Sequence, residues 1–273
     1  MTPNAAHRVL PGFRLAMSWT LLYTTLLVVV PLLACFAKAS TLSPSEFLAA
    51  VWTPRARAAY GVTFGASLTA SAVSVVLGLL VAWVFVRYSF PLKRFLDSLI
   101  DLPFALPTAV AGLVYSDLYV EKGWLGRFLV PLGIKGAYSW LAIVLVLTFI
   151  GVPFVVRTVQ PVLAEIDADV EEAAACLGAN RWQTFRRVLF PMLLPAGITG
   201  FALAFARSLG EYGSVVFVSG NMPFKTEIAP VLIVSRLEEF AYAEATAIAV
   251  VLLLISFSML VVINLLERWS RYE

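Results

Sequence analysis

Long stretches without a charged residue alternate with short polar segments along the whole chain. The uncharged stretches cover residues 15–36, 62–86, 102–116, 137–156, 188–206 and 245–266. A helix needs about 20 consecutive apolar residues to cross the hydrocarbon core of a bilayer. The pattern therefore predicts an all-α polytopic membrane protein with six transmembrane helices. The first stretch is too long for the core of a secretory signal, so we expect it to remain as an uncleaved span.

Two of these spans contain residues that are unusual inside a membrane helix. The third contains Pro103 and Pro107, and proline bends a helix and frees carbonyl groups that lipid cannot satisfy. We expect this span to face other helices or a water-filled path, with Asp101 capping its start. The fifth span is expected to continue through Arg207 and Glu211 to residue 218, which would bury two charges.

Composition agrees with a membrane protein and argues against several other classes. The 273 residues are 60% hydrophobic and 14% charged, and the net charge of +3 offers no basic surface for nucleic acid. His7 is the single histidine, and Cys35 and Cys176 are the two cysteines, so we expect neither a metal site nor a disulfide. The chain shows no pairing of a nucleophile with a base, and we predict no catalytic residues.

The Lys and Arg residues that flank the spans predict the orientation. With the N-terminus inside, the cytoplasmic segments carry more Lys and Arg than the outer ones. This cytoplasmic set is Arg8, Arg14, Arg87, Lys93, Arg94, Arg157, Arg181, Arg186, Arg187, Arg268 and Arg271. We therefore expect a multi-pass protein of the cell inner membrane with both termini in the cytoplasm.

The polar segment between the fourth and fifth spans contains EEAAACLGANRWQTFRRVLFP at residues 171–191. Just before it, Asp169 stands three residues ahead of Glu172, which is the spacing of a helix capping box. Gly178 supplies the left-handed conformation that commonly ends a helix. The first part of the segment is therefore expected to form one short, capped helix.

A second start signal follows directly. Asn180 and Gln183 again have the spacing of a capping box, and we expect Pro191 to end the helix that they begin. The residues alone allow two interpretations of this pair of helices. They could rest on lipid headgroups, or they could form a docking face for another protein.

The same segment resembles a known motif. Glu172, Ala173 and Ala174, then Gly178 after three residues and VLFP at 188–191 after nine more, are similar to the EAA loop of binding-protein-dependent ABC importer permeases. The resemblance implies a type I ABC importer permease fold. It also implies that residues 165–191, here called the coupling loop, dock onto a cytoplasmic ATPase. The residues implied in this coupling are Glu171, Glu172, Ala173, Ala174, Gly178 and Pro191.

Further blocks narrow the resemblance to the sulfate/thiosulfate permease subunits of that family, the CysT type. These blocks are RVLPGF at 8–13, DLPFALPTAVAGL at 101–113, PFVVRTVQPVL at 153–163, RSLGEYGSVVF at 207–217 and KTE at 225–227. Molybdate or tungstate permeases of the same fold are the alternative, and a non-ABC anion channel is a third interpretation. The implied organisation is a tail, first span and outer loop over 1–60, a type-1 permease domain over 61–266 and a cytoplasmic tail over 267–273.

No Gly-x-x-x-x-Gly-Lys-Ser/Thr sequence is present, so the chain has no P-loop to hold ATP phosphates. We expect that the chain is not an enzyme and binds no cofactor of its own. The resemblance implies that a partner ATPase dimer uses ATP and Mg²⁺. It further implies a second homologous permease subunit and a periplasmic sulfate/thiosulfate-binding protein as partners, besides membrane lipid.

Arg207 and Glu211 are the charges expected inside the fifth span. A charge in the middle of a bilayer costs at least about 2.5 kcal/mol, so both should face a path or a partner. Their i, i+4 spacing allows a mutual salt bridge, while Arg207 could also give a dianion a transient positive contact. The remaining residues expected along the translocation path are Gly210 and Gly213, which would pack closely or bend at a gate, and Pro103, Pro107 and Thr108, which would shape its wall.

Overall fold

The computed structural model describes the backbone of residues 12–270 and the side chains of residues 12–267. His7, Arg8, Arg268 and Arg271, used above, therefore have side chains outside the described part. The described part contains helices and no strands, which confirms the all-α prediction. Five helices are long and apolar enough to cross a membrane, namely Phe13–Ala39, Pro54–Arg87, Trp140–Glu165, Arg181–Leu209 and Tyr242–Glu267.

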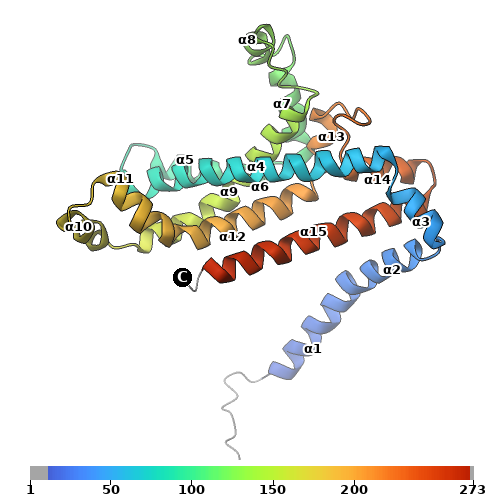
Figure 1. The fold of residues 1–273 in the computed structure, drawn as a ribbon, viewed down its shortest axis with the longest axis horizontal. Helices are drawn as coiled ribbons and strands as arrows, with labels where there is room; N and C mark the ends of the chain where they lie inside the picture. Colours follow the sequence, from blue (N-terminus) through green and yellow to red (C-terminus); the bar gives the residue numbers. More distant parts are fainter. Residues whose placement is uncertain (1–11, 271–273) are drawn as a thin grey trace, which may run out of the picture.

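These long helices are composed as follows (Figure 1). They are α1 (Phe13–Thr24), the π-helical turn η1 (Thr25–Val29) and α2 (Val30–Ala39); α4 (Pro54–Arg87); α9 (Trp140–Glu165); α11 (Arg181–Thr184), the π-helical turn η3 (Phe185–Leu189) and α12 (Phe190–Leu209); and α15 (Tyr242–Ser270). The shorter elements are α3 (Pro44–Val51), α5 (Lys93–Ile100), α6 (Leu102–Ala105), α7 (Thr108–Tyr119), α8 (Gly126–Leu129), the 3₁₀ turn η2 (Val130–Leu132), α10 (Ala168–Cys176), α13 (Val215–Val218) and α14 (Ala229–Glu238).

The centre of the bundle consists of α4, α9 and α12, which lie side by side (Figure 1). Small residues let these helices approach closely, as is common in membrane bundles. A Cβ atom added to Gly78 of α4 would lie 2.6 Å from the Cβ of Val155 in α9, and one on Gly200 of α12 would lie 2.9 Å from the Val155 Cα. Apolar side chains such as Val159 and Leu193 complete this core.

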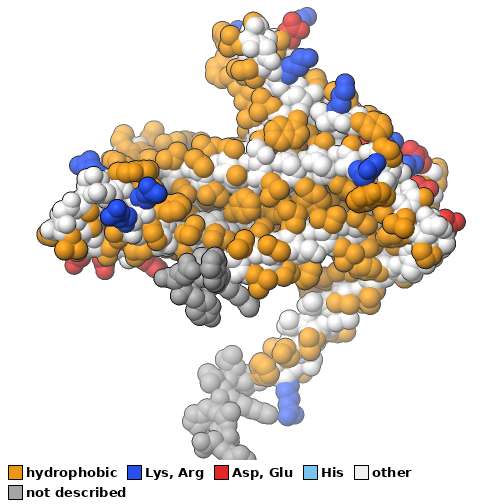
Figure 2. All heavy atoms as spheres, viewed as in Figure 1, with side chains coloured by type: hydrophobic (Ala, Val, Ile, Leu, Met, Phe, Trp, Pro, Cys, Tyr) orange, Lys and Arg blue, Asp and Glu red, His pale blue; other side chains and the backbone are white. Residues whose placement is uncertain are grey.

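Two arms leave the bundle. The arm formed by α7 and α8 projects from its side, and the arm formed by α1 and α2 contacts α15 through α2 and diverges from it toward α1 (Figure 1). No residue in the apolar 18-residue stretch of Phe13–Ala39 is buried against the described part of the chain. Figure 2 shows hydrophobic side chains along both arms and over the bundle, as expected for surfaces that meet lipid or another apolar partner.

The third expected span is divided by its prolines. Helix α6 ends at Ala105, Leu106 has the extended conformation that proline imposes on the residue before it, and α7 begins after Pro107. The expected bend is thus confirmed. The expectation for Asp101 is wrong, because it makes no side-chain cap on α6, and its carboxylate accepts hydrogen bonds from Arg157 instead.

The fifth span differs from its prediction at both ends. It does not continue as one helix to residue 218, because α12 ends at Leu209 and the Glu211 carboxylate stabilises a turn before α13. Nor does Pro191 end a helix, since the helix of 181–209 passes through it. The π-helical turn η3 lies directly before Pro191, and its wider hydrogen-bond spacing accommodates the proline.

Candidate functional site

Helix α10 forms the exposed tip at one end of the molecule (Figure 1). Asp167 occupies its N-cap position and makes no side-chain hydrogen bond there, so the capping box predicted for Asp169 and Glu172 is not formed. Asp169 lies in the first turn instead, where its charge still complements the helix dipole. The helix starts earlier than predicted because buried Ile166 fixes the chain in the core before α10 begins.

The alanines of α10 divide between two faces. Ala174 is buried, while Glu172 and Ala173 are exposed to solvent. Glu171 forms an ion pair of 2.5 Å with Arg87 at the end of α4. One face of α10 is therefore attached to the bundle, and the face with Glu172 and Ala173 is left available to another molecule.

Gly178 ends α10 as predicted. Its φ of 84° is left-handed, the amide of Gly178 donates to Ala175 O, and the amide of Ala179 donates to Ala174 O. This pair of hydrogen bonds is the Schellman arrangement, which satisfies carbonyl groups at a helix end. The capping box of Asn180 and Gln183 is confirmed, with both reciprocal bonds at 2.9 Å.

Two large apolar side chains at this tip are exposed, and the sequence reasoning missed one of them, Leu177. Leu177 is 89% exposed in the bend after α10, and Trp182 is 66% exposed in the next helix. An apolar residue directly before the glycine of a surface bend is the signal that could have identified Leu177. Large exposed apolar side chains beside a helix with a free face are typical of an interaction site.

The residues after Asn180 connect the tip to the membrane without interruption. Helix α11, turn η3 and α12 form one helix of 29 residues. At 1.5 Å per residue it extends for about 40 Å, which is more than the thickness of the hydrocarbon core. Asn180, which caps this helix, and Arg207 therefore lie near its opposite ends.

Arg207 and Glu211 are joined as their spacing suggested, by an ion pair. The Glu211 side chain is 2% exposed, whereas Arg207 is 37% exposed. One Glu211 oxygen accepts hydrogen bonds from both the amide and the hydroxyl of Ser214, each at 2.9 Å. The predicted salt bridge between the two residues is thus confirmed, and the Arg207 guanidinium remains partly accessible on the surface of the bundle.

The turn after α12 packs against the start of α7. A Cβ on Gly213 would lie 2.2 Å from Thr108 Oγ1, and one on Gly112 would lie 2.2 Å from Ser214 O. Close packing is therefore confirmed for Gly213. Gly210 does not pack closely, since an added Cβ would meet nothing within 4 Å, and it stands where α12 ends, so the alternative role of a bend at a gate stays a prediction for it.

The structure thus brings some of the predicted path residues together and separates others. Arg207, Glu211, Gly213 and Thr108 form one connected group, and Pro107 directly precedes it. Pro103 lies in a separate apolar groove of about 480 Å³ between α4, α5, α6, α7 and α9.

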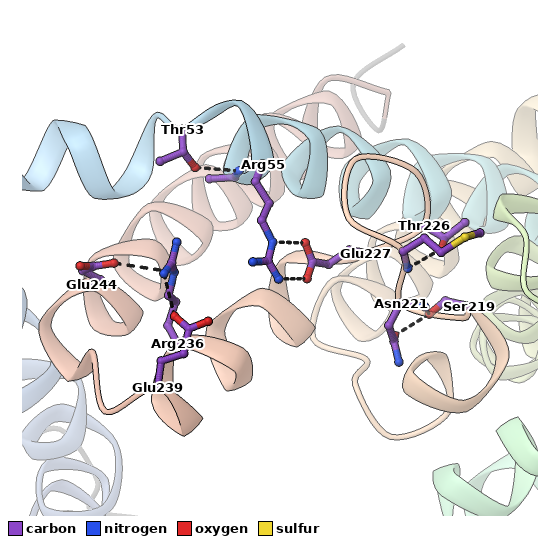
Figure 3. Close-up of polar contacts among 11 residues, drawn as sticks. Thr53, Arg55, Ser219, Asn221, Thr226, Glu227, Arg236, Glu239 and Glu244 are labelled. Carbon is purple, nitrogen blue, oxygen red and sulfur yellow. Dashed lines mark hydrogen bonds and ion pairs between the residues drawn. The ribbon is translucent and has the colours of Figure 1, made fainter.

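At the opposite end, an ion pair joins segments far apart in the sequence (Figure 3). Arg55 at the start of α4 donates two hydrogen bonds to Glu227, at 2.8 and 2.6 Å. Glu227 belongs to the KTE block and is 2% exposed. Nearby, Thr226 Oγ1 accepts from the Met222 amide and Asn221 bonds to Ser219, so the loop before α14 is internally ordered.

A protein-family model described as "Binding-protein-dependent transport system inner membrane component" matches residues 74–272, most of the chain. The chain belongs to this family. The resemblance of its sequence blocks to CysT-type permeases is also confirmed by relatives of that name. This permease is thus a multi-pass membrane protein, and its coupling loop and Arg207 lie within the matched residues.

Relatives of similar length cover nearly the whole permease. It is 50% identical over 263 residues to the sulfate transport system permease protein CysT of Synechococcus elongatus, with 95% of each chain covered. It is 46% identical over 268 residues to the protein of that name from Escherichia coli, with 98% of this chain and 97% of that one covered.

Solved structures of transporters support the fold. A bacterial ABC transporter involved in the import of the polysaccharide alginate matches with a TM-score of 0.73 and 16% identity, over 94% of this chain and 96% of that one. The MetNI methionine ABC transporter matches with a TM-score of 0.56 and 19% identity, over 84% and 99% of the two chains. The permease therefore has the predicted fold of ABC importer permeases.

Proposed function

We propose that this permease is the transmembrane pathway subunit of an ATP-driven importer for sulfate and thiosulfate. The observation that carries the proposal is the identity of about half the residues to proteins named sulfate transport permease, over nearly the whole length of both chains. The likeness extends through the blocks at residues 101–113, 153–163 and 207–217, which lie along the predicted path. The chain itself performs no ATP hydrolysis in this proposal.

The coupling loop is the proposed contact with a cytoplasmic ATPase dimer that uses ATP and Mg²⁺. Three features support this role. Helix α10 has an exposed face with Glu172 and Ala173, and Leu177 adds an exposed apolar side chain beside it. Caps at both sides of the bend make the tip rigid, and a rigid tip transmits a displacement that a flexible loop would absorb.

A second permease subunit is the proposed partner within the membrane. The described part of the chain buries no residue in the apolar stretch of the first span, α1 to α2, so a large apolar surface is left for a partner and lipid. Whether the second subunit is a copy of this chain or a homologue is decided by purifying the assembled importer and identifying its subunits. A periplasmic protein that binds sulfate or thiosulfate is the proposed source of the anion, and one structural neighbour was solved with a bound periplasmic protein.

The proposed orientation places both termini and the coupling loop in the cytoplasm, and the end with Arg55 and Glu227 on the outer side. ATP binding would draw the coupling loops of two subunits together and open the path outward, and hydrolysis would return it inward. The partly exposed guanidinium of Arg207 would contact the anion only weakly because Glu211 already neutralises it. Weak contact suits a path, since a site that binds tightly cannot release.

Uptake of labelled sulfate into vesicles that contain the reconstituted importer tests the proposal. We expect ATP-dependent uptake that excess molybdate does not inhibit. In the double variant Glu172→Arg/Gly178→Trp, uptake should vanish and the ATPase should no longer copurify. The control is Lys122→Gln, an exposed change outside the coupling loop that should leave both unchanged.

Each outcome has a distinct meaning. Uptake of molybdate or tungstate alone would replace the proposed substrate with that of the alternative permeases. Uptake in the double variant at the normal rate would refute the docking role of the coupling loop. Passage of anion through the purified chain without ATPase or ATP would refute the importer and favour a channel.

A further inference from the structure

Arg157, in the part of α9 nearest the coupling loop, is the centre of a dense polar cluster. Its Nε and Nη2 donate to the two carboxylate oxygens of Asp101, at 2.9 and 2.7 Å. Its Nη1 donates to Asp97 Oδ1 at 2.9 Å and to Gln160 Oε1 at 3.0 Å, and Nη2 also donates to the Asp97 carbonyl at 2.9 Å. Every guanidinium nitrogen is therefore engaged, and the contact with Asp101 is the bidentate geometry that Arg favours.

The cluster fastens a segment that has little other attachment. Helices α5 and α6 contribute no buried side chain, and Phe95 on α5 is 62% exposed. Apart from the cluster, the edge-to-face contact of Phe104 with Phe154, with centroids 5.0 Å apart, joins this segment to α9. Segments with few buried contacts are the ones that open or move most easily.

The cluster also lies between the two parts of the proposed machinery. Beyond Arg157, α9 continues to Glu165 and leads through two residues into α10, the coupling helix. In the other direction, Asp101 leads through α6 and the break at Pro107 to Thr108, which packs against Gly213. The backbone on either side of the Arg157–Asp101 contact therefore connects α10 with the start of α7.

We propose that Arg157 is a positioning residue for transport, which fixes residues 93–107 to α9 so that movement of the coupling helix also moves the start of α7. This inference rests on the proposed coupling role of the loop and does not depend on which anion is carried. Arg157 contacts no substrate in this arrangement, since two carboxylates surround its charge. Its partners are a third to almost half exposed, so the link can break and form again during a transport cycle.

Hydrogen–deuterium exchange of the importer purified with its ATPase tests the link without reference to the anion. In the wild type, a nonhydrolysable ATP analogue should change the exchange of amides in both α10 and residues 93–119. In Arg157→Gln, the change should persist in α10 and disappear from 93–119. Arg94→Gln is the matched control, because Arg94 is exposed on α5 and takes no part in the cluster.

Transport per ATP hydrolysed is the second measurement, made with whichever of sulfate or molybdate the wild type carries. We expect Arg157→Gln to lower this ratio about tenfold, within the range of typical couplings between sites, while assembly and ATPase activity are retained. Arg157→Lys keeps the charge but loses the bidentate hydrogen bonds, so its transport per ATP should lie between the values for the wild type and Arg157→Gln.

Several results would overturn the inference. They are an Arg157→Gln protein with the wild-type exchange response in 93–119, an equal loss in Arg94→Gln, or no response of 93–119 in the wild type. If Arg157→Gln does not assemble, Asp97→Asn/Asp101→Asn removes the acidic side of the cluster, and a normal response in that variant would equally refute the link. An importer that moves no sulfate, but whose exchange response in 93–119 disappears in Arg157→Gln, would refute the proposed substrate and support the link.

Discussion

Removal of Arg55 should destabilise the permease much more than removal of its partner Glu227. The two side chains share a bidentate ion pair, but Glu227 is 2% exposed and Arg55 is 30% exposed. In Arg55→Gln the carboxylate stays buried without a cation, which costs about 3 kcal/mol or more. In Glu227→Gln the guanidinium turns toward water, so we expect a loss of about 1 kcal/mol, the scale of a partly exposed pair.

The assay is equilibrium unfolding of the purified permease in mixed micelles with increasing SDS, followed by helical circular dichroism. The double variant Arg55→Gln/Glu227→Gln completes a cycle that isolates the interaction between the two residues. We expect the double variant to be more stable than Arg55→Gln alone, because it no longer contains a buried unpaired charge. Arg236→Gln is the control at the same end, since its partners Glu239 and Glu244 are about half exposed (Figure 3).

Equal losses in the two single variants would refute the reasoning from burial. A double variant no more stable than Arg55→Gln would show that the cost comes from packing of the arginine stem rather than from the stranded carboxylate. A loss in Arg236→Gln as large as that in Arg55→Gln would show that exposure does not decide the outcome.

Three further predictions concern single contacts. Gly213→Ala should lower the free energy of unfolding by about 1–3 kcal/mol because its Cβ would overlap Thr108 Oγ1, Thr108→Ala should recover part of this loss, and Gly210→Ala should be tolerated. Asn180→Ala removes the cap of the helix that follows the bend and should cost about 1 kcal/mol, measured as faster amide exchange at Gln183 and Thr184. The Ser43 hydroxyl and amide donate hydrogen bonds to the Glu46 carboxylate and lower its pKa. Protection of α3 amides from hydrogen exchange should therefore be present above the ordinary carboxyl pKa and be lost as the pH falls through the lowered pKa. The variant Glu46→Gln should abolish this pH dependence.

Hydropathy located the spans because a single continuous run of apolar residues is sufficient evidence for a membrane helix. It could not locate their ends, which depend on individual hydrogen bonds. Residues 208–218 contain a single charge, Glu211, and the fifth span was expected to continue through them, yet α12 ends at Leu209 because Glu211 accepts a hydrogen bond from the Ser214 amide and holds a turn. The break at Pro107 was predictable, since proline disfavours the helical conformation of the residue before it, and Leu106 is extended. The same rule failed at Pro191, which lies inside the helix of 181–209.

Contacts between distant residues were beyond the reach of sequence patterns. Arg55 and Glu227 are 172 residues apart, and Arg157 and Asp101 are 56 apart. A capping box can be found because its two members lie within one helical turn, as with Asn180 and Gln183. Long-range ion pairs have no such spacing, so the sequence showed the blocks that contain Arg157 and Asp101 without showing that they meet.

The two attachments of α10 decide how the coupling loop can act. On one side Glu171 binds Arg87 at the end of α4, and on the other the capped bend leads directly into the helix that continues as α12. Since α4 and α12 both pack on α9, a displacement of α10 would pass to these three helices in the proposed mechanism. Helices α5 and α6 bury no side chain and could lag behind such a movement, and for that reason their fastening at Arg157 would decide, in the proposed mechanism, whether the path opens when the loop moves.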